Sequence, residues 1–235
     1  MEQRLISQGI LLYKTGKYTE ALHFFQSLSS EQVNDLDVIY FIGLCYTKLK
    51  RYEDALLYLE QIVTAIPEDD VQQDRILQCR LVLAVIYATT GRSRLAEFEL
   101  RSLKETGYNP CAVYAAMAYI SWLQQDYTKS IEQYEKVLEM EPENITALNG
   151  LGYVLACLNK DLTRALMLSK RALDISPNSP ACLDTLGWVY YKLGLLDEAE
   201  NFLRKALDKD GSNEEILEHL KMIQASRENS ASGGK

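Results

Sequence analysis

The segment LDTLGWVYYKLGLLDEAENFLRKAL, residues 183–207, decides the fold of this chain. It contains two stretches with apolar residues at helical spacing, separated by a break around Gly194. The first stretch contains Gly187, and the second contains Ala199 twelve residues later. Two helices approach closely only where their side chains are small, so the segment predicts a tightly packed helical hairpin.

The same pair of small residues recurs along the chain. Its first member returns at intervals of 34, 41, 34, 34 and 35 residues, at Gly9, Gly43, Ala84, Ala118, Gly152 and Gly187. The second member follows at Ala21, Ala55, Ala96, Ser130, Ala165 and Ala199. It lies 13 residues after the first member in the pair Gly152–Ala165 and 12 residues after it in the other five pairs. A fixed period of this length indicates a repeat protein. We predict six helix–turn–helix units, over residues 2–35, 36–69, 77–110, 111–144, 145–179 and 180–213.

Three segments fall outside these units. Residues 70–76, DVQQDRI, either lengthen a helix or form an acidic loop. Residues 214–227 are predicted to form a helix that caps the apolar end of the stack, with one apolar stripe of Ile216, Leu217, Leu220 and Ile223. The small polar residues 228–235 are predicted to be a disordered tail. Residues 1–227 are then expected to form a single domain.

These features resemble the tetratricopeptide repeat family. Tyr18, Tyr52 and Tyr127 each precede the second small residue by three positions, and Pro67, Pro142 and Pro177 end three units. The resemblance implies an all-α fold, a right-handed superhelical solenoid with a C-terminal capping helix. Residues 147–156 and 181–207 are also similar to the last repeats of bacterial, envelope-associated members of the family, which suggests a bacterial origin.

The resemblance also implies where a ligand would lie. In this family the first helices of the units line the concave surface, and ligands commonly lie along it. Carried over residue by residue, the pattern places ten candidate partner-binding residues there: Tyr40, Leu44, Tyr119, Trp122, Asn149, Tyr153, Asp184, Trp188, Tyr191 and Lys192. One subclass grips chaperone tails with a Lys/Asn/Arg clamp. Here Ile6 and Ile10, or Tyr40 and Leu44, stand at its Lys and Asn positions, so the clamp is missing and a chaperone-tail adaptor is disfavoured.

An apolar and aromatic surface suits a ligand that presents an amphipathic helix or aromatic side chains. We therefore predict a non-enzymatic scaffold or adaptor that binds a peptide or helix of a partner protein. Self-assembly into a structural oligomer is one alternative, and carriage of an apolar small molecule is another.

Composition disfavours other classes of function. The net charge of −8 argues against a nucleic-acid partner, which requires a basic face. No catalytic motif or cofactor signature is found. The five cysteines lie in apolar helical stretches without a C-x-x-C pair, so we expect core residues in a reducing compartment and no metal site. No segment predicts a signal peptide or membrane insertion. We expect a cytoplasmic protein, or a periplasmic one if a targeting segment has been removed.

Overall fold

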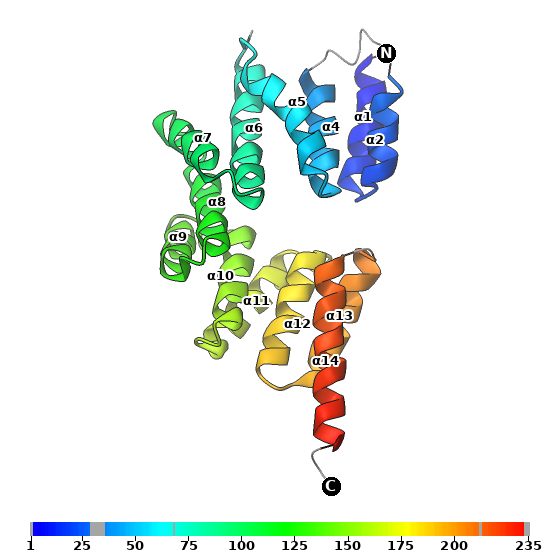
Figure 1. The fold of residues 1–235 in the computed structure, drawn as a ribbon, viewed down its shortest axis with the longest axis vertical. Coiled ribbons are helices and arrows are strands. Elements are labelled where there is room, and N and C mark those ends of the chain that lie inside the picture. The colour runs from blue at the N-terminus through cyan, green and yellow to red at the C-terminus, as the bar shows by residue number, and fades with distance from the viewer. Residues whose placement is uncertain (1, 29–35, 68, 212, 233–235) are drawn as a thin grey trace. The chain divides into compact units, whose positions relative to one another are not determined.

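The computed structural model describes residues 2–28, 36–67, 69–211 and 213–232. These residues form thirteen α-helices and no β-strand, so the chain is the all-α helical repeat solenoid that the sequence predicts (Figure 1). None of these helices is both long and apolar enough to cross a membrane. The helices are α1 (Glu2–Lys14), α2 (Tyr18–Gln26), α4 (Leu36–Lys48), α5 (Tyr52–Val63), α6 (Asp70–Thr89), α7 (Ser93–Glu105), α8 (Pro110–Leu123), α9 (Tyr127–Met140), α10 (Ile145–Cys157), α11 (Leu162–Ile175), α12 (Pro180–Lys192), α13 (Leu196–Lys209) and α14 (Glu214–Ser232).

Helices that follow one another in the chain pair into hairpins, for example α4 with α5, α10 with α11 and α12 with α13. The sequence leaves open whether residues 70–76 lengthen a helix or form an acidic loop. In the structure they lengthen a helix, because α6 begins at Asp70. The Asp69 carboxylate caps this helix by accepting a 2.8 Å hydrogen bond from the backbone N–H of Gln72. The acidic run therefore serves as a helix start.

The small residues allow the close helix contacts that the sequence predicts. A Cβ atom on Gly187 would lie 2.8 Å from Leu203 Cγ and 3.1 Å from the Ala199 carbonyl oxygen. A Cβ atom on Gly43 would lie 2.5 Å from Leu59 Cδ2. In both hairpins the side chain over the glycine comes four residues after the small residue of the second helix. The small pair brings the helices together, and a leucine one turn later fills the contact.

The repeat also appears in the backbone of the turns. One residue after the first helix of each unit has a positive φ, with the 34, 41, 34, 34 and 35 residue spacing of the small residues: Gly16, Lys50, Gly91, Gln125, Asn159 and Gly194. At the last turn the N–H groups of Gly194 and Leu195 donate to the carbonyls of Tyr191 and Tyr190. This pairing is the Schellman motif, which requires a left-handed residue and favours glycine.

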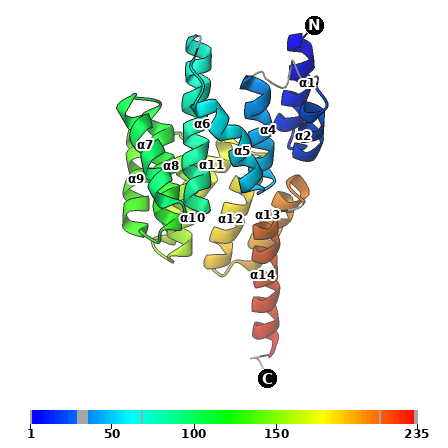
Figure 2. The ribbon, with the colours of Figure 1, turned by 45° about the horizontal axis from the view of Figure 1, so that its top comes forward.

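The helices group into two compact units, Met1–Ala116 and Met117–Lys235, and the boundary falls within α8. Figure 2 shows α11, α12 and α13 following one another in the second unit, where each contacts the next. Contacts between neighbours in sequence are expected in any repeat protein. The prediction of a single domain over residues 1–227 stays a prediction.

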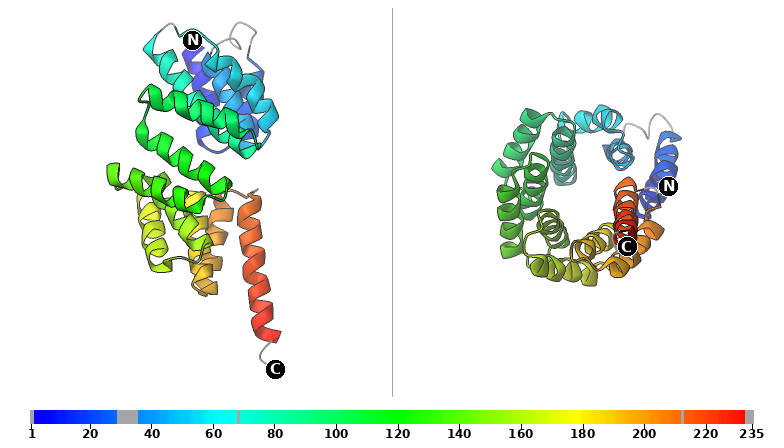
Figure 3. Two further views of the ribbon diagram at one scale, coloured as in Figure 1. Left: turned by 60° about the vertical axis from the view of Figure 1, so that its left-hand side comes forward. Right: turned by 60° about the horizontal axis from the view of Figure 1, so that its bottom comes forward.

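Helix α14 takes the position of a first helix in a seventh unit. It packs against α13 and α12 (Figure 3). Its Ile216 and Ile223 are fully buried. Its His219 lies 35 residues after Asp184, the same interval that separates the last two units, and the two side chains are hydrogen-bonded. Met222 stands 35 residues after Gly187 and is 46% exposed, so no small residue there admits a further helix. Within the described residues, α14 is a first helix without a second.

Helix α14 is longer than predicted. It continues to Ser232, so the predicted end at residue 227 and a tail that is disordered from 228 are corrected for residues 228–232. The sequence between Arg227 and the glycine at 233 contains no proline or glycine that would stop a helix. Residues 233–235 lie outside the described residues.

The cysteines occupy the positions that the sequence predicts. All five are free thiols, and Cys45, Cys79, Cys111 and Cys182 are buried, while Cys157 is partly exposed. Four of them therefore act as small core residues.

Candidate functional site

Six ring side chains of the second unit form a continuous line, which we call the aromatic ladder. The distances between neighbouring ring centroids along it are 5.1, 5.8, 6.5, 4.2 and 5.0 Å. Most of these spacings are those of favourable ring pairs. The rings come in turn from α9, α8, α10, α14 and α12: Tyr127, Trp122, Tyr153, His219, Trp188 and Tyr191.

Trp188 and His219 are the two buried rings of the ladder, with 7% and 6% of their surfaces exposed. The Trp188 indole stacks on His219 at 4.2 Å and on Tyr191 at 5.0 Å. The indole N–H donates to Cys157 Sγ over 3.3 Å, and the Lys192 ammonium lies 4.7 Å from the ring centroid. The sequence predicts Trp188 as a partner-binding residue, but the chain's own helices already occupy its surroundings.

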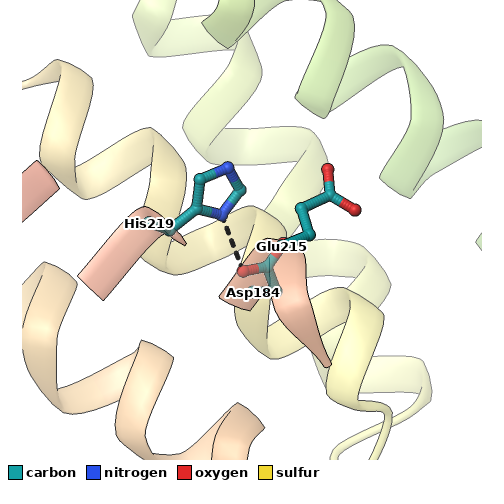
Figure 4. Close-up of side chains that lie close together, drawn as sticks. All are labelled: Asp184, Glu215 and His219. Carbon is teal, nitrogen blue, oxygen red and sulfur yellow. Dashed lines mark hydrogen bonds and ion pairs between the residues drawn. The ribbon is translucent and has the colours of Figure 1, made fainter. Parts of the chain in front are cut away.

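A polar cluster lies beside the ladder, where α14 meets α12 and α10. His219 Nδ1 is 2.8 Å from Asp184 Oδ1, and both side chains are buried (Figure 4). The exposed Glu215, one helical turn before His219, accepts a 2.8 Å hydrogen bond from the Tyr153 hydroxyl. One ligand atom from each of Asp184, Glu215 and His219 lies within 4.8 Å of the others, so these three could hold a metal ion.

Tyr153 is held as a neutral hydrogen-bond donor. Burial raises the pKa of its hydroxyl well above the ordinary value, and the neighbouring Cys157 and Glu215 raise it further. The Cys157 thiol also has a raised pKa, chiefly because of burial, although hydrogen bonds from Trp188 and Tyr153 oppose this. This part of the ladder therefore carries no activated nucleophile.

One end of the ladder, Tyr127 and Trp122, borders on exposed side chains of α8, and we call this the exposed end. Tyr119 and Leu123 are each 39% exposed, and the half-buried Trp122 lies between them in sequence. Tyr119, Tyr153 and Trp188 occupy equivalent positions, 34 and 35 residues apart, on three successive first helices. Tyr119 on α8 is thus more exposed than its equivalent Trp188 on α12, which α14 covers.

The remaining predicted residues of the second unit are partly covered. Tyr191 is half-buried, and its hydroxyl lies 3.2 Å from Ser226 Oγ on α14. Lys192 is half-buried over Trp188. Asn149 is half-buried, and its Oδ1 atom is buried without a hydrogen-bond partner in the structure.

The two predicted residues of the first unit do not form a comparable surface. Tyr40 is buried, with the Arg75 guanidinium 4.5 Å from its ring centroid, and burial raises the pKa of its hydroxyl to about 12. Arg75 also forms a 2.7 Å ion pair with Asp37. Leu44 is half-buried. We therefore do not assign Tyr40, Asp184 or Trp188 to a partner contact, because each is buried by the chain itself.

Sequence reasoning missed His219, Glu215 and Cys157 as neighbours of the ladder. The one available signal was the repeat interval, which places His219 one interval of 35 residues after Asp184. If α14 is treated as the first helix of a seventh unit, this interval predicts that His219 on α14 lies beside Asp184 on α12.

A hollow of about 410 Å³ lies elsewhere on the second unit, lined by Glu135, Leu138, Glu139 and Arg164. Its Arg164 guanidinium pairs with Glu135 at 2.7 Å. A paired carboxylate and a leucine provide neither a nucleophile nor an oriented base, so the hollow does not resemble a catalytic site.

Sequence profiles of known families match several parts of the chain. Two profiles described as Tetratricopeptide repeat match residues 112–144 and 143–210. A profile described as Anaphase-promoting complex, cyclosome, subunit 3 matches residues 3–62.

Two curated proteins match stretches of the chain. A stretch of 58 residues, 25% of this chain, is 40% identical to 9% of Intraflagellar transport protein 70A from Danio rerio. A stretch of 142 residues, 60% of this chain, is 25% identical to 12% of Cellulose synthase operon protein C from Escherichia coli (strain K12). The chain thus corresponds to a small part of each relative.

Solved structures share the fold over nearly the whole chain. A tetratricopeptide repeat protein from Parabacteroides merdae ATCC 43184 aligns with a TM-score of 0.74 at 16% identity, over 95% of this chain and 84% of that chain. The APC/C hetero-tetramer Cut9–Hcn1 aligns with a TM-score of 0.66 at 14% identity, over 95% of this chain and 43% of that chain. At these identities the likeness shows the fold alone.

Proposed function

Because this chain belongs to the tetratricopeptide repeat family, we propose that it is a protein-interaction scaffold that binds a helix or peptide of a partner along the exposed end of the aromatic ladder. Tyr119, Trp122 and Leu123 on α8 form the centre of this contact, and Tyr153 lies beside them. The partner contributes apolar side chains, and the scaffold performs no chemistry.

The exposure of Tyr119 and Leu123 carries this proposal. Each is 39% exposed, whereas the six rings of the ladder are half-buried or buried. Aromatic side chains that lose little conformational freedom are the residues that most often dominate protein interfaces. A partner side chain placed against Trp122 and Tyr119 would extend the ladder by one further apolar contact.

Helix α14 supports the choice of a helical partner. It contacts the ladder through Glu215, His219 and Ser226, which lie on one helical face at intervals of four and seven residues. This is the spacing with which an amphipathic helix reads a surface. A partner helix with apolar residues at the same spacing fits the neighbouring, exposed part of the ladder.

Site-specific photo-crosslinking tests this proposal. A photoreactive phenylalanine analogue replaces Tyr119 in one variant and Phe98 on α7, which is 60% exposed, in the control. We expect a crosslink to another protein from position 119 and none from position 98. A crosslink between two copies of this chain would support self-assembly instead, and a lipid adduct would support the carrier alternative. Equal crosslinking at both positions would contradict the assignment of the face.

A second measurement connects the surface to affinity. The double variant Tyr119→Ala/Leu123→Ala should weaken binding of the crosslinked partner at least about tenfold, because a central aromatic contact contributes about 2 kcal/mol or more. The melting temperature should change little, since both side chains are partly exposed. An unchanged affinity would place the contact elsewhere.

A further inference from the structure

We propose that Asp184, Glu215 and His219 form a binding site for one divalent transition-metal ion, such as Zn²⁺, which joins the C-terminal helix α14 to α12. This site is separate from the proposed partner contact on α8. It does not depend on that proposal.

The ligand atoms come from two helices in a suitable arrangement. Glu215 and His219 are four residues apart on α14, so they lie on one face of that helix, and Asp184 on α12 lies opposite. The three ligand atoms are within 4.8 Å of one another. In Figure 4 the Asp184 carboxylate and the His219 ring meet directly, and the Glu215 carboxylate stands to one side of them.

The movement needed to accept an ion is small. Zinc binds nitrogen and carboxylate oxygen at about 2.0–2.2 Å, so two ligands of a tetrahedral site are about 3.4 Å apart. Asp184 Oδ1 and His219 Nδ1 are now 2.8 Å apart and would separate by roughly half an ångström. The exposed Glu215 side chain closes the remaining distance by rotating about its own bonds, which does not disturb the core.

The buried carboxylate of Asp184 would be stabilised by a bound cation. Among the residues that the structure describes, its one hydrogen-bond partner is the His219 ring nitrogen. A buried carboxylate is costly unless it is paired or coordinates a metal. A divalent cation would compensate the charges of Asp184 and Glu215 together.

The chemistry of the three ligands selects the class of ion. One imidazole nitrogen with two carboxylates suits Zn²⁺, Co²⁺ or Ni²⁺, whereas Mg²⁺ and Ca²⁺ prefer oxygen alone. His219 binds the ion through Nδ1, which must carry no proton in the bound state.

Neighbouring groups already hold two of the ligands in place. The Tyr153 hydroxyl donates to Glu215 Oε1 over 2.8 Å, and the Trp188 indole stacks on the His219 ring at 4.2 Å. Such outer contacts orient the ligands of metal sites. Glu215 is exposed while Asp184 and His219 are buried, so the ion enters from the Glu215 side and keeps a position for water.

Metal titration of the full chain tests the site. Chelator-treated protein without a histidine tag is titrated with Zn²⁺ by calorimetry and with Co²⁺ by absorption. We expect one ion per chain, a higher melting temperature with Zn²⁺, and a Co²⁺ spectrum without a thiolate charge-transfer band. Mg²⁺ should bind much more weakly than Zn²⁺.

Matched variants assign the ligands. Glu215→Gln should lower the Zn²⁺ affinity by at least about tenfold, because losing a ligand costs no less than losing an outer contact. Glu218→Gln, a change to an exposed residue on the same helix, should leave the affinity unchanged. Asp184→Asn gives a second test that retains side-chain volume. Circular dichroism confirms the fold of each variant.

Several results would overturn the proposal. These are no saturable binding of Zn²⁺ or Co²⁺, a thiolate band that assigns the ion to cysteine, equal binding of Mg²⁺, or equal affinity in wild type and Glu215→Gln. An exposed His23 on α2 provides the remaining check, because His23→Gln should have no effect.

Discussion

The imidazole of His219 stacks on the indole of Trp188, with ring centroids 4.2 Å apart and planes 19° apart. The two rings come from α14 and α12, so the last helix completes the aromatic ladder of the second unit. Trp188 is therefore a packing residue at the junction of the capping helix. The partner contact that we propose lies at the α8 end, where Tyr119 and Leu123 are each 39% exposed.

Replacing Trp188 should destabilise the second unit far more than replacing Tyr119. Trp188→Ala removes a buried ring, two stacking contacts and the hydrogen bond to Cys157, and should lower the free energy of unfolding by about 3–5 kcal/mol. Tyr119→Ala should cost less than about 1 kcal/mol, as is usual for surface changes. Urea unfolding followed by circular dichroism measures both. Equal costs would show that Trp188 is not a core residue.

Removing α14 should expose Trp188 to water. A chain that ends at residue 213 lacks His219 and Ser226, which cover the Trp188–Tyr191 pair. In a Trp122→Phe background, the emission of the remaining tryptophan should shift to longer wavelength, and acrylamide should quench it more strongly. The full-length Trp122→Phe protein is the control. An unchanged spectrum would mean that α14 does not cover this ring.

The fold was predictable because its signal is periodic. The interval between Gly152 and Gly187 marks equivalent helix contacts, and the same interval appears in the positive-φ residues Asn159 and Gly194. Each contact lies within one hairpin, so a local pattern determines it. Side-chain volume at one position is enough to predict which residues approach.

The candidate site was less predictable, because burial on the first helices depends on the elements that come after them in the chain. Asp184 and Trp188 have the register of ligand-binding residues, but α14 covers both. Tyr40 has the same register and is covered by Arg75, which comes from the seven residues outside the repeat pattern. The seven extra residues and the added helix α14 therefore decided which inner residues are covered, and the pattern of paired small residues extends to neither.

Two glycines of one hairpin should respond to alanine for different reasons. Gly187→Ala places a Cβ atom 2.8 Å from Leu203 Cγ and 3.1 Å from the Ala199 carbonyl oxygen, so the helices must separate. Overpacking of this kind costs about 1–3 kcal/mol. Gly194→Ala has open space around the new atom but forces a non-glycine residue to φ 77°, at a cost of about 1–2 kcal/mol.

A repacking change separates the two costs. Leu203→Ala should rescue part of the loss in Gly187→Ala, because it removes the side chain that the new Cβ atom meets. The same change should add its full cost to Gly194→Ala, where no contact is involved. Double-mutant cycles in urea measure the coupling. Equal coupling for both glycines would contradict a steric role for Gly187.

The buried thiols should be unreactive in the folded protein and make it less stable at high pH. Burial raises the pKa of the Cys45 and Cys79 thiols to about 12, from an ordinary value of 9.0. Because the thiolate is the reactive form, Ellman's reagent at pH 8 should modify these thiols far more slowly in the native protein than in urea. Rapid native modification of both would contradict their burial.

The pH dependence of stability follows from the same shifts. A raised thiol pKa means that the folded state keeps protons which the unfolded chain releases. Below about pH 9 both states are protonated and these groups do not change the free energy of unfolding. Between about pH 9 and 12 only the thiols of the unfolded chain ionise, so stability should fall as pH rises, by up to about 1.4 kcal/mol per pH unit for each thiol.

The double variant Cys45→Ala/Cys79→Ala should flatten this part of the curve in urea titrations at successive pH values, even though it lowers stability at neutral pH. A slope that the variant does not change would assign the alkaline loss to other groups, of which the buried Tyr153 hydroxyl, with its raised pKa, is the first to examine.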